Sequence, residues 1–358
     1  MIKFYGMKVA IISDIHLGLH ANSELWHDII LNYGNWLKQE LEKQNIMDLL
    51  VLGDIFNNRE EIGVKTLHVT EQFFKIFSSS VSPFNIYLLN GNHDSYFRDN
   101  SSINSISIFK GWSNITVIDK PESITVHNKK ITFIPWGLHN DIPSDNDLLF
   151  GHFEINTFKK NVAKLCEDGL DSSVLLEKAK LIMSGHFHLR DEREYKNGKI
   201  IYVGCPFQQN WNDINTTKGY YILNTVDLSY EFFENNVTPK YISIKLSDYF
   251  DKTKLENIRK VIPNNFIKLI VDQDISYENF EKILNVSTLL KPLEISSNFE
   301  NKKELKVDEN YEVVHLDMKV LIEEFVKSLD IKLLSDKVLK ELDNIYNSAL
   351  NRVKIEEK

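Results

Sequence analysis

Three apolar runs alternate with two segments of helical spacing at the start of the chain. The runs cover Lys8 to Ser13, Met47 to Leu52 and Phe84 to Leu89. Between them, residues 24–43 and Val64 to Phe77 carry apolar side chains three and four positions apart, as amphipathic helices do. Strands that alternate with helices favour parallel pairing through right-handed crossovers. The three strands therefore end at one edge of a sheet, where open α/β sheets bind their ligands.

Short strand-like runs replace this pattern after about residue 115. One helix is predicted among them, from Thr157 to Leu165, with an extension near Leu175 to Lys180. We expect these runs to form a second sheet packed on the first. The runs are Ile131 to Trp136, Asp147 to Phe150, Leu181 to Ser184, Lys199 to Val203, Tyr220 to Leu223 and Tyr230 to Phe233.

The character of the chain changes twice more towards its C-terminus. Strand-like and helical runs between residues 237 and 295 predict a small α+β domain after a main domain of residues 1–236. Residues 296–315 are polar and charged, which predicts a linker. Residues 316–358 carry apolar stripes at helical spacing, which predicts an amphipathic helix pair. The apolar face of this tail packs either on a partner or back on the main domain.

Polar side chains follow the ends of five predicted strands. They suit a metal site, because carboxylate, amide and imidazole groups together bind borderline divalent ions such as manganese, iron or zinc. Seven ligands are too many for one tetrahedral ion and about right for two ions, with Asp54 as the natural bridge. The candidate ligands are Asp14, His16, Asp54, Asn92, His152, His186 and His188.

Each motif taken alone has an ordinary structural explanation. A single Asp-x-His or Gly-Asp is common by chance, and a histidine after an apolar run is usually structural. His186 and His188 are more specific, because alternation places both imidazoles on one side of an extended segment. The ordered combination after five strands favours a metal site over coincidence.

These motifs resemble those of calcineurin-like metallophosphoesterases, and within them the SbcD-type nuclease subunits of double-strand-break repair, including the phage forms. The narrower resemblance is carried by Ser13 to Gly18 and by Tyr202 to Gln209. It implies an α/β (α+β) fold, a four-layer sandwich of two mixed β-sheets flanked by helices. A capping domain that positions DNA and a C-terminal helix pair would complete the chain.

The resemblance also implies a mechanism and partners. One metal would be held by Asp14, His16, Asp54 and His188, and the other by Asp54, Asn92, His152 and His186. His93 would stabilise or protonate the transition state, and Asp94 would orient the imidazole of His93. The family implies two manganese ions, DNA as substrate, a homodimer, and an SMC-like (SbcC-type) ATPase that binds the C-terminal helices.

Composition bears on how the chain binds nucleic acid and on its cellular compartment. A net charge of −9 argues against a strongly basic nucleic-acid binder, but metal ions can neutralise phosphate locally. Two cysteines, Cys166 and Cys205, are too few for a disulfide framework and favour the cytoplasm. No apolar run approaches the roughly 20 residues of a membrane span.

Two other functions remain open on the sequence alone. The first is another phosphoesterase of the superfamily, acting on small phosphate esters or cyclic nucleotides. The second is a scaffold without activity that binds the ATPase. The capping segment and the tail argue against the first, and the intact candidate ligands argue against the second.

Overall fold

The computed structural model describes residues 2–78, 83–162 and 164–299. A six-stranded sheet forms around the three predicted parallel strands, in the order β12-β11-β1-β2-β3-β4. Strands β1 to β4 pair in parallel, whereas β11 and β12 join antiparallel on the far side of β1. Its strands are β1 (Lys8–Ile12), β2 (Asp48–Val51), β3 (Asn85–Leu89), β4 (Ile115–Ile118), β11 (Gly219–Asn224) and β12 (Tyr230–Glu234).

A second six-stranded sheet packs on the first, in the order β5-β6-β7-β8-β10-β9. It is also mixed, because β6, β7, β8 and β10 run parallel and the two edge strands run antiparallel. Its strands are β5 (Glu122–Val126), β6 (Lys129–Ile134), β7 (Asn146–His152), β8 (Ala179–Gly185), β9 (Asp191–Tyr195) and β10 (Gly198–Tyr202).

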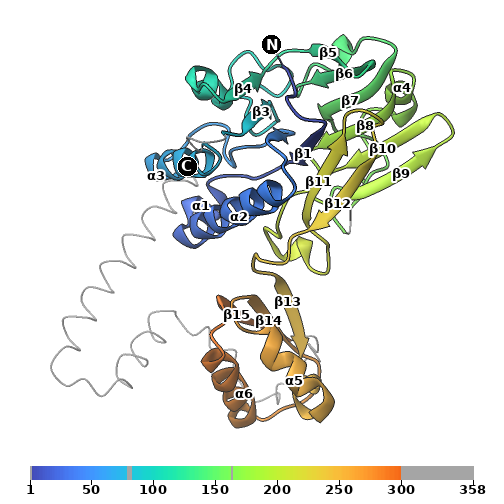
Figure 1. The fold of residues 1–358 in the computed structure, drawn as a ribbon. Coiled ribbons are helices and arrows are strands. Elements are labelled where there is room, and N and C mark those ends of the chain that lie inside the picture. The colour runs from blue at the N-terminus through green and yellow to red at the C-terminus, as the bar shows by residue number, and fades with distance from the viewer. Residues whose placement is uncertain (1, 79–82, 163, 300–358) are drawn as a thin grey trace, which may run out of the picture. The chain divides into compact units, whose positions relative to one another are not determined.

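Helices cover the outer faces of the two sheets (Figure 1). The first sheet carries α1 (Leu19–Asn22), α2 (Glu24–Lys43) and α3 (Val64–Ile76), and the second carries the short α4 (Ser172–Leu176). Among the described residues, 3-10 helices complete the connections: η1 (Ser105–Gly111), η2 (His139–Asp141), η3 (Trp211–Asp213) and η4 (Leu246–Phe250). None of the helices in the described part of the chain has the length and hydrophobicity that a bilayer crossing requires.

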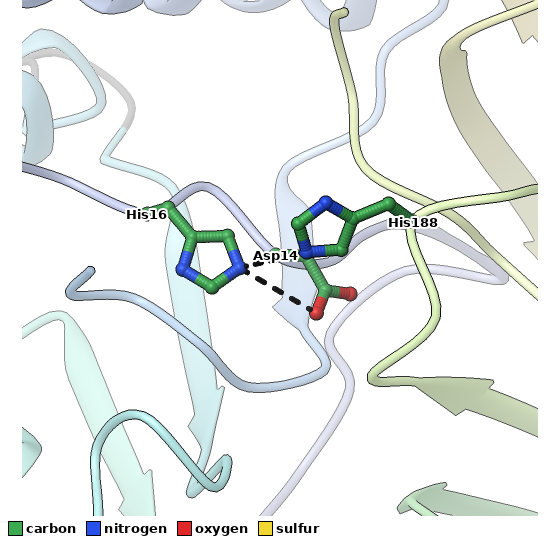
Figure 2. A group of neighbouring side chains, drawn as sticks. All are labelled: Asp14, His16 and His188. Carbon is green, nitrogen blue, oxygen red and sulfur yellow. Dashed lines mark hydrogen bonds and ion pairs between the residues drawn. The ribbon is translucent and has the colours of Figure 1, made fainter. Parts of the chain in front are cut away.

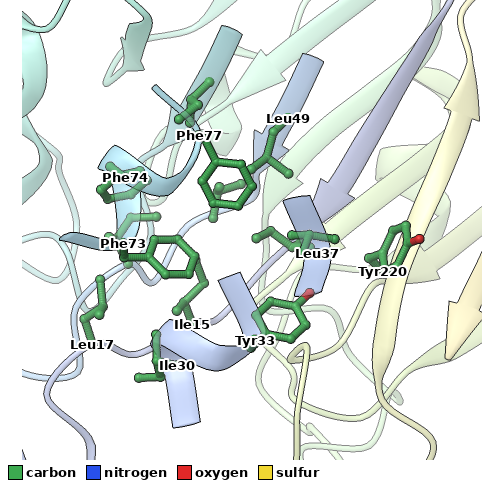
Figure 3. Close-up of a cluster of buried hydrophobic side chains, with 14 of the residues drawn as sticks. Ile15, Leu17, Ile30, Tyr33, Leu37, Leu49, Phe73, Phe74, Phe77 and Tyr220 are labelled. Atoms are coloured by element: carbon green, nitrogen blue, oxygen red, sulfur yellow. The ribbon is translucent and has the colours of Figure 1, made fainter. Parts of the chain in front are cut away.

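Strand alternation divides the buried side chains between separate cores. Ala10 and Ile12 of β1 face the helices, whereas Val9 and Ile11 face the second sheet. Figure 3 shows the helix-facing core, where side chains of α2 and α3 meet those of the sheet. A third core lies between the second sheet and α4. These layers confirm the predicted four-layer sandwich.

Two predictions about the second half of this sandwich are wrong. Strands β11 and β12 belong to the first sheet, because β11 pairs with β1 from Lys8 to Ile11. Periodicity marks a strand but not its partner. The predicted helix at 157–165 is also not present in its described residues. Thr157 has a positive φ of 71°, its N–H donates to the Cys166 carbonyl, and the N–H of Cys166 donates to the Phe158 carbonyl, which closes a loop.

A smaller parallel sheet follows, with strands β13 (Tyr241–Lys245), β14 (Phe266–Val271) and β15 (Glu294–Phe299) and helices α5 (Lys252–Val261) and α6 (Tyr277–Leu289). Its own core contains Ile244, Ile258 and Leu269. The first residues of the predicted linker, 296–299, are part of β15. The rest of that linker, from residue 300, and the tail at 316–358 lie outside the described residues.

Candidate metal centre

Five loops meet at the shared edge of the two sheets. Asp14 and His16 follow β1, Asp54 follows β2, and Asn92 follows β3. His152 is the last residue of β7, and His186 and His188 come directly after β8. Backbone hydrogen bonds tie these loops together: the N–H groups of Asp14 and His16 donate to the carbonyls of Gly53 and Asp54, each at 3.0 Å. The structure therefore brings all seven predicted ligands to one place.

The first group consists of Asp14, His16 and His188 (Figure 2). The Nε2 atoms of His16 and His188 lie 3.0 Å apart, and the His16 Nε2 lies 4.0 Å from the Asp14 carboxylate. Two ligands that each lie about 2.1 Å from one metal ion are roughly 3.0 to 3.4 Å apart. The spacing of the two imidazoles therefore fits a shared ion.

The second group consists of Asp54, Asn92, His152 and His186. The Asn92 Oδ1 lies 2.9 Å from the His152 Nε2 and 2.7 Å from the His186 Nδ1. The His152 Nε2 lies 3.4 Å from the Asp54 Oδ1. Four side chains from the ends of four strands thus direct ligand atoms at one point.

Asp54 lies between the two groups. Its Oδ1 faces His152, and its Oδ2 lies 3.6 Å from the Nε2 of His16. One carboxylate therefore presents one oxygen to each group, as a carboxylate that bridges two ions can. The residues fit a pair of divalent ions, although their role as ligands stays a prediction.

The loops hold these side chains in strained backbone conformations. Asp14, His16 and Asp54 have φ near +55°, and His186 has φ of 91°. Such angles are uncommon outside glycine and gather at functional sites. Gly91 lets the loop after β3 pack closely against the loop after β2, because a Cβ at Gly91 would collide with the backbone and carboxylate of Asp54.

Burial and mutual charge shift the pKa values of these groups. Burial raises the pKa of Asp14 to about 7, with His152 opposing the shift and Asp54 adding to it. Burial disfavours the charged form of Asp54 too, but the imidazoles of His152 and His16 outweigh it and hold its pKa well below the ordinary value. Burial likewise opposes the charge on His152, yet Asp54 raises the His152 pKa to about 9. Burial lowers the pKa of His186 to about 3. A neutral imidazole is the form that binds a metal.

His93 lies beside the first group, outside both sets of ligands. Its ring centroid is 4.9 Å from that of His16, with the two rings nearly perpendicular. The Nδ1 of His93 lies 2.7 Å from the carbonyl oxygen of Asn57. A carbonyl only accepts hydrogen bonds, so Nδ1 carries the proton and Nε2 remains for a substrate.

The predicted role of Asp94 is wrong. Its carboxylate accepts the backbone N–H groups of Ile55, Phe56 and Gly91, at 3.0, 3.1 and 3.0 Å. It therefore fixes the two motif loops against each other, while the carbonyl of Asn57 orients His93. Adjacency in sequence did not reveal that the Asp94 side chain turns back under the loop.

Two further side chains support the ligands and were not predicted. Gln209 donates to the carbonyl of Asp14 at 2.6 Å, and it belongs to the segment that carried the family resemblance. The buried Lys218 donates to the carbonyl of His188 and to the carboxylate of Asp213, both at 2.6 Å. No pattern in the sequence marked Lys218. His20 lies outside both ligand groups: its Nε2 meets the Gln209 carbonyl and its ring stacks on Trp26.

Candidate metal ligands at the shared edge of two packed mixed sheets are typical of metallophosphoesterases. The chain belongs to the calcineurin-like phosphoesterase family, whose sequence profile matches residues 7–190 and so includes all seven candidate ligands. The family predicted from the motifs is confirmed, and its members are divalent-metal hydrolases of phosphoesters.

The chain is also similar to individual proteins of known sequence or structure. The chain is similar to exonuclease subunit 1 of Enterobacteria phage T4, with 26% identity over 347 residues that cover 92% of this chain and 95% of that protein. Among solved structures it matches an archaeal phosphodiesterase (14% identity, TM-score 0.34, 64% of this chain and 99% of the other). It also matches zinc-bound Vps29 from Entamoeba histolytica (13% identity, TM-score 0.31, 64% and 98%). The similarity to a phage exonuclease subunit supports the predicted nuclease branch.

Proposed function

We propose that this chain is the nuclease subunit of a DNA-processing complex and hydrolyses phosphodiester bonds with two divalent metal ions, most simply manganese. The observation that carries the proposal is the position of Asp54, whose two carboxylate oxygens face two separate ligand groups. The similarity to a phage exonuclease subunit supports DNA as the substrate.

In this proposal seven residues bind the metal ions and one histidine acts on the leaving group. Asp14, His16 and His188 would hold one ion, Asn92, His152 and His186 would hold the other, and Asp54 would bind both. When bound, the ions stabilise negative charge on the phosphate and acidify water. A water oxygen attacks phosphorus in line with the leaving oxygen, and the new P–O bond forms as the old one breaks. With its Nδ1–H held by the Asn57 carbonyl, the doubly protonated imidazole of His93 donates the proton on Nε2 to the leaving oxygen and is left neutral.

The test compares substrates and histidine variants in the presence of manganese. Linear duplex, single-stranded DNA, cyclic nucleotides and small phosphate esters separate a nuclease from other phosphoesterases. His93→Asn should lower cleavage about 100-fold or more, in the range of general acid catalysis. His127→Asn is the matched control, because His127 is exposed in the turn between β5 and β6. Equal activity of the two variants, or activity on small esters alone, would contradict the proposal.

We further propose a homodimer formed through α3 and η1. These elements contact each other through Phe74 and Phe109, whose ring centroids lie 4.8 Å apart. They expose apolar side chains on their outer surface, including Val64 (84% exposed) and Ile108 (53%). Ile108→Glu should convert a dimer into a monomer in sedimentation experiments. A monomeric wild-type protein would refute this part of the proposal.

The remaining parts of the chain are assigned to partners and substrate positioning. We propose that residues 237–295 form a capping domain over the DNA, connected to the body where Trp26 stacks on Phe266 at 5.5 Å. We propose that residues 316–358 dock an SMC-like ATPase in the cytoplasm. Leu342→Glu in the full chain should abolish co-purification with that ATPase and leave cleavage of single-stranded DNA unchanged. Retained co-purification would place the docking surface elsewhere.

A further inference from the structure

A cavity adjoins the metal centre. It has a volume of about 430 Å³ and includes His152 in its wall, so the cavity and the second ligand group share one imidazole. The other walls come from the loop after β3, the segment around Trp136 and the loop after β7. This volume falls in the range of roughly 300 to 1,000 Å³ that is typical of small-molecule pockets.

The indole of Trp136 forms a fixed aromatic wall of this cavity. Its Nε1–H donates to the carbonyl of Arg98 at 2.7 Å, and its backbone N–H donates to Asn90 at 2.9 Å. The indole centroid lies 5.0 Å from that of His186 and 6.0 Å from that of His152. The side chain is nevertheless only partly buried. A ring that is held in place before binding loses little conformational entropy when a planar ligand stacks on it.

The charges around the cavity argue against a phosphate inside it. Asp99, Glu154 and Asp168 all line it, and Glu154 forms an ion pair with Lys160. Arg98 also lines the cavity, so the carboxylates outnumber the arginine and lysine side chains in its wall. Carboxylates repel phosphate but accept hydrogen bonds from the amino groups of bases. The cavity therefore suits a neutral, planar, amino-bearing group.

We propose that this cavity, the Trp136 pocket, binds the base of the nucleotide whose phosphate lies at the metal centre. The inference rests on the proposed nuclease function, which supplies the phosphodiester. A base reaches the pocket only after it leaves its stack and its pairing partner. The pocket therefore selects an unpaired nucleotide, at a single-stranded or frayed end, and Trp136 acts as a binding residue for it.

The first experiment moves an abasic nucleotide along a labelled single-stranded oligonucleotide and measures kcat/KM with manganese. Stacking of a base on an aromatic side chain contributes about 1–3 kcal/mol, so one abasic position should slow the wild-type protein by about 5- to 150-fold. On the intact strand, the kcat/KM of Trp136→Ala should be lower than that of the wild type by the same factor, and an abasic position should not lower it further. Trp136→Phe should retain most of the difference between the intact and the abasic strand. Equal sensitivity of the wild type and Trp136→Ala at every position would overturn the proposal.

The second experiment measures binding without metal or turnover. Deoxyadenosine monophosphate should quench tryptophan fluorescence in a saturable way in the wild type and in Trp36→Phe, a matched control on α2. Trp136→Phe should lose that quenching, and an unchanged signal would contradict the pocket. Calorimetric titration with manganese shows whether a Trp136 variant disturbs His186. If Trp136→Ala binds manganese more weakly than the wild type, the proposal is judged on Trp136→Phe instead. A Trp136→Phe variant with wild-type manganese affinity that loses the dAMP quenching supports the pocket, and one that keeps it contradicts the pocket.

The two failures can be told apart. If the wild type leaves all DNA intact but Trp136-dependent quenching remains, the nuclease function fails and the base pocket stands. If DNA is cleaved with no dependence on the base and quenching does not involve Trp136, the function stands and the pocket fails.

Discussion

Replacing Asp94 by alanine separates a structural role from a catalytic one. The carboxylate is 1% exposed and accepts three backbone N–H groups, from Ile55, Phe56 and Gly91. A hydrogen bond to a charged group contributes about 1.5–3 kcal/mol. Burial and the nearby Asp54 oppose its charged form and raise the pKa of Asp94 to about 6, which offsets part of this gain. We therefore expect Asp94→Ala to cost about 3–5 kcal/mol, because three buried donors lose their acceptor.

The assay is thermal unfolding followed by circular dichroism. A loss of this size should lower the Tm by roughly 10 °C, since 1 kcal/mol corresponds to about 2–4 °C in a domain of this size class. Asp28→Ala, at an exposed position of α2, is the control and should leave the Tm unchanged. If Asp94→Ala kept the wild-type Tm and only lowered kcat, Asp94 would act on His93 after all, and the structural argument would be refuted.

Three further predictions concern the metal centre. Asp54→Asn should reduce the bound manganese from two ions per chain to one or none in calorimetric titration, and two ions in the variant would exclude bridging. The apparent manganese affinity should rise between pH 7 and pH 9, because the ion must displace a proton from His152. Burial opposes the charge on His152, but Asp54 raises its pKa to about 9. An affinity that does not change over this pH range would contradict the assignment of His152 as a ligand. Lys218→Met should destabilise the fold by about 3–5 kcal/mol in urea unfolding, since it leaves the Asp213 carboxylate buried without its cation; unchanged stability would show that Asp213 finds another partner.

Local sequence patterns were sufficient to predict the parallel strands of the core and the clustering of the candidate ligands. Each candidate ligand follows an apolar strand, and parallel strands end at the same edge, so strand direction alone placed Asp14, Asp54 and Asn92 side by side. His186 and His188 follow from the same rule in the second sheet.

Features that depend on distant contacts were not predictable in this way. The antiparallel pairing of β11 with β1 joins residues more than two hundred positions apart. The direction of the Asp94 side chain depends on backbone donors of another loop. Asn57 acts through its carbonyl, which every residue possesses, so its side-chain type carried no signal.

The most direct test of the account is anomalous diffraction from crystals soaked in manganese. Two peaks should appear about 3.5–4 Å apart, one on each side of the Asp54 carboxylate. The first peak should contact Asp14, His16 and His188, and the second should contact Asn92, His152 and His186. A single peak, or two peaks that do not share Asp54, would contradict the two-ion centre.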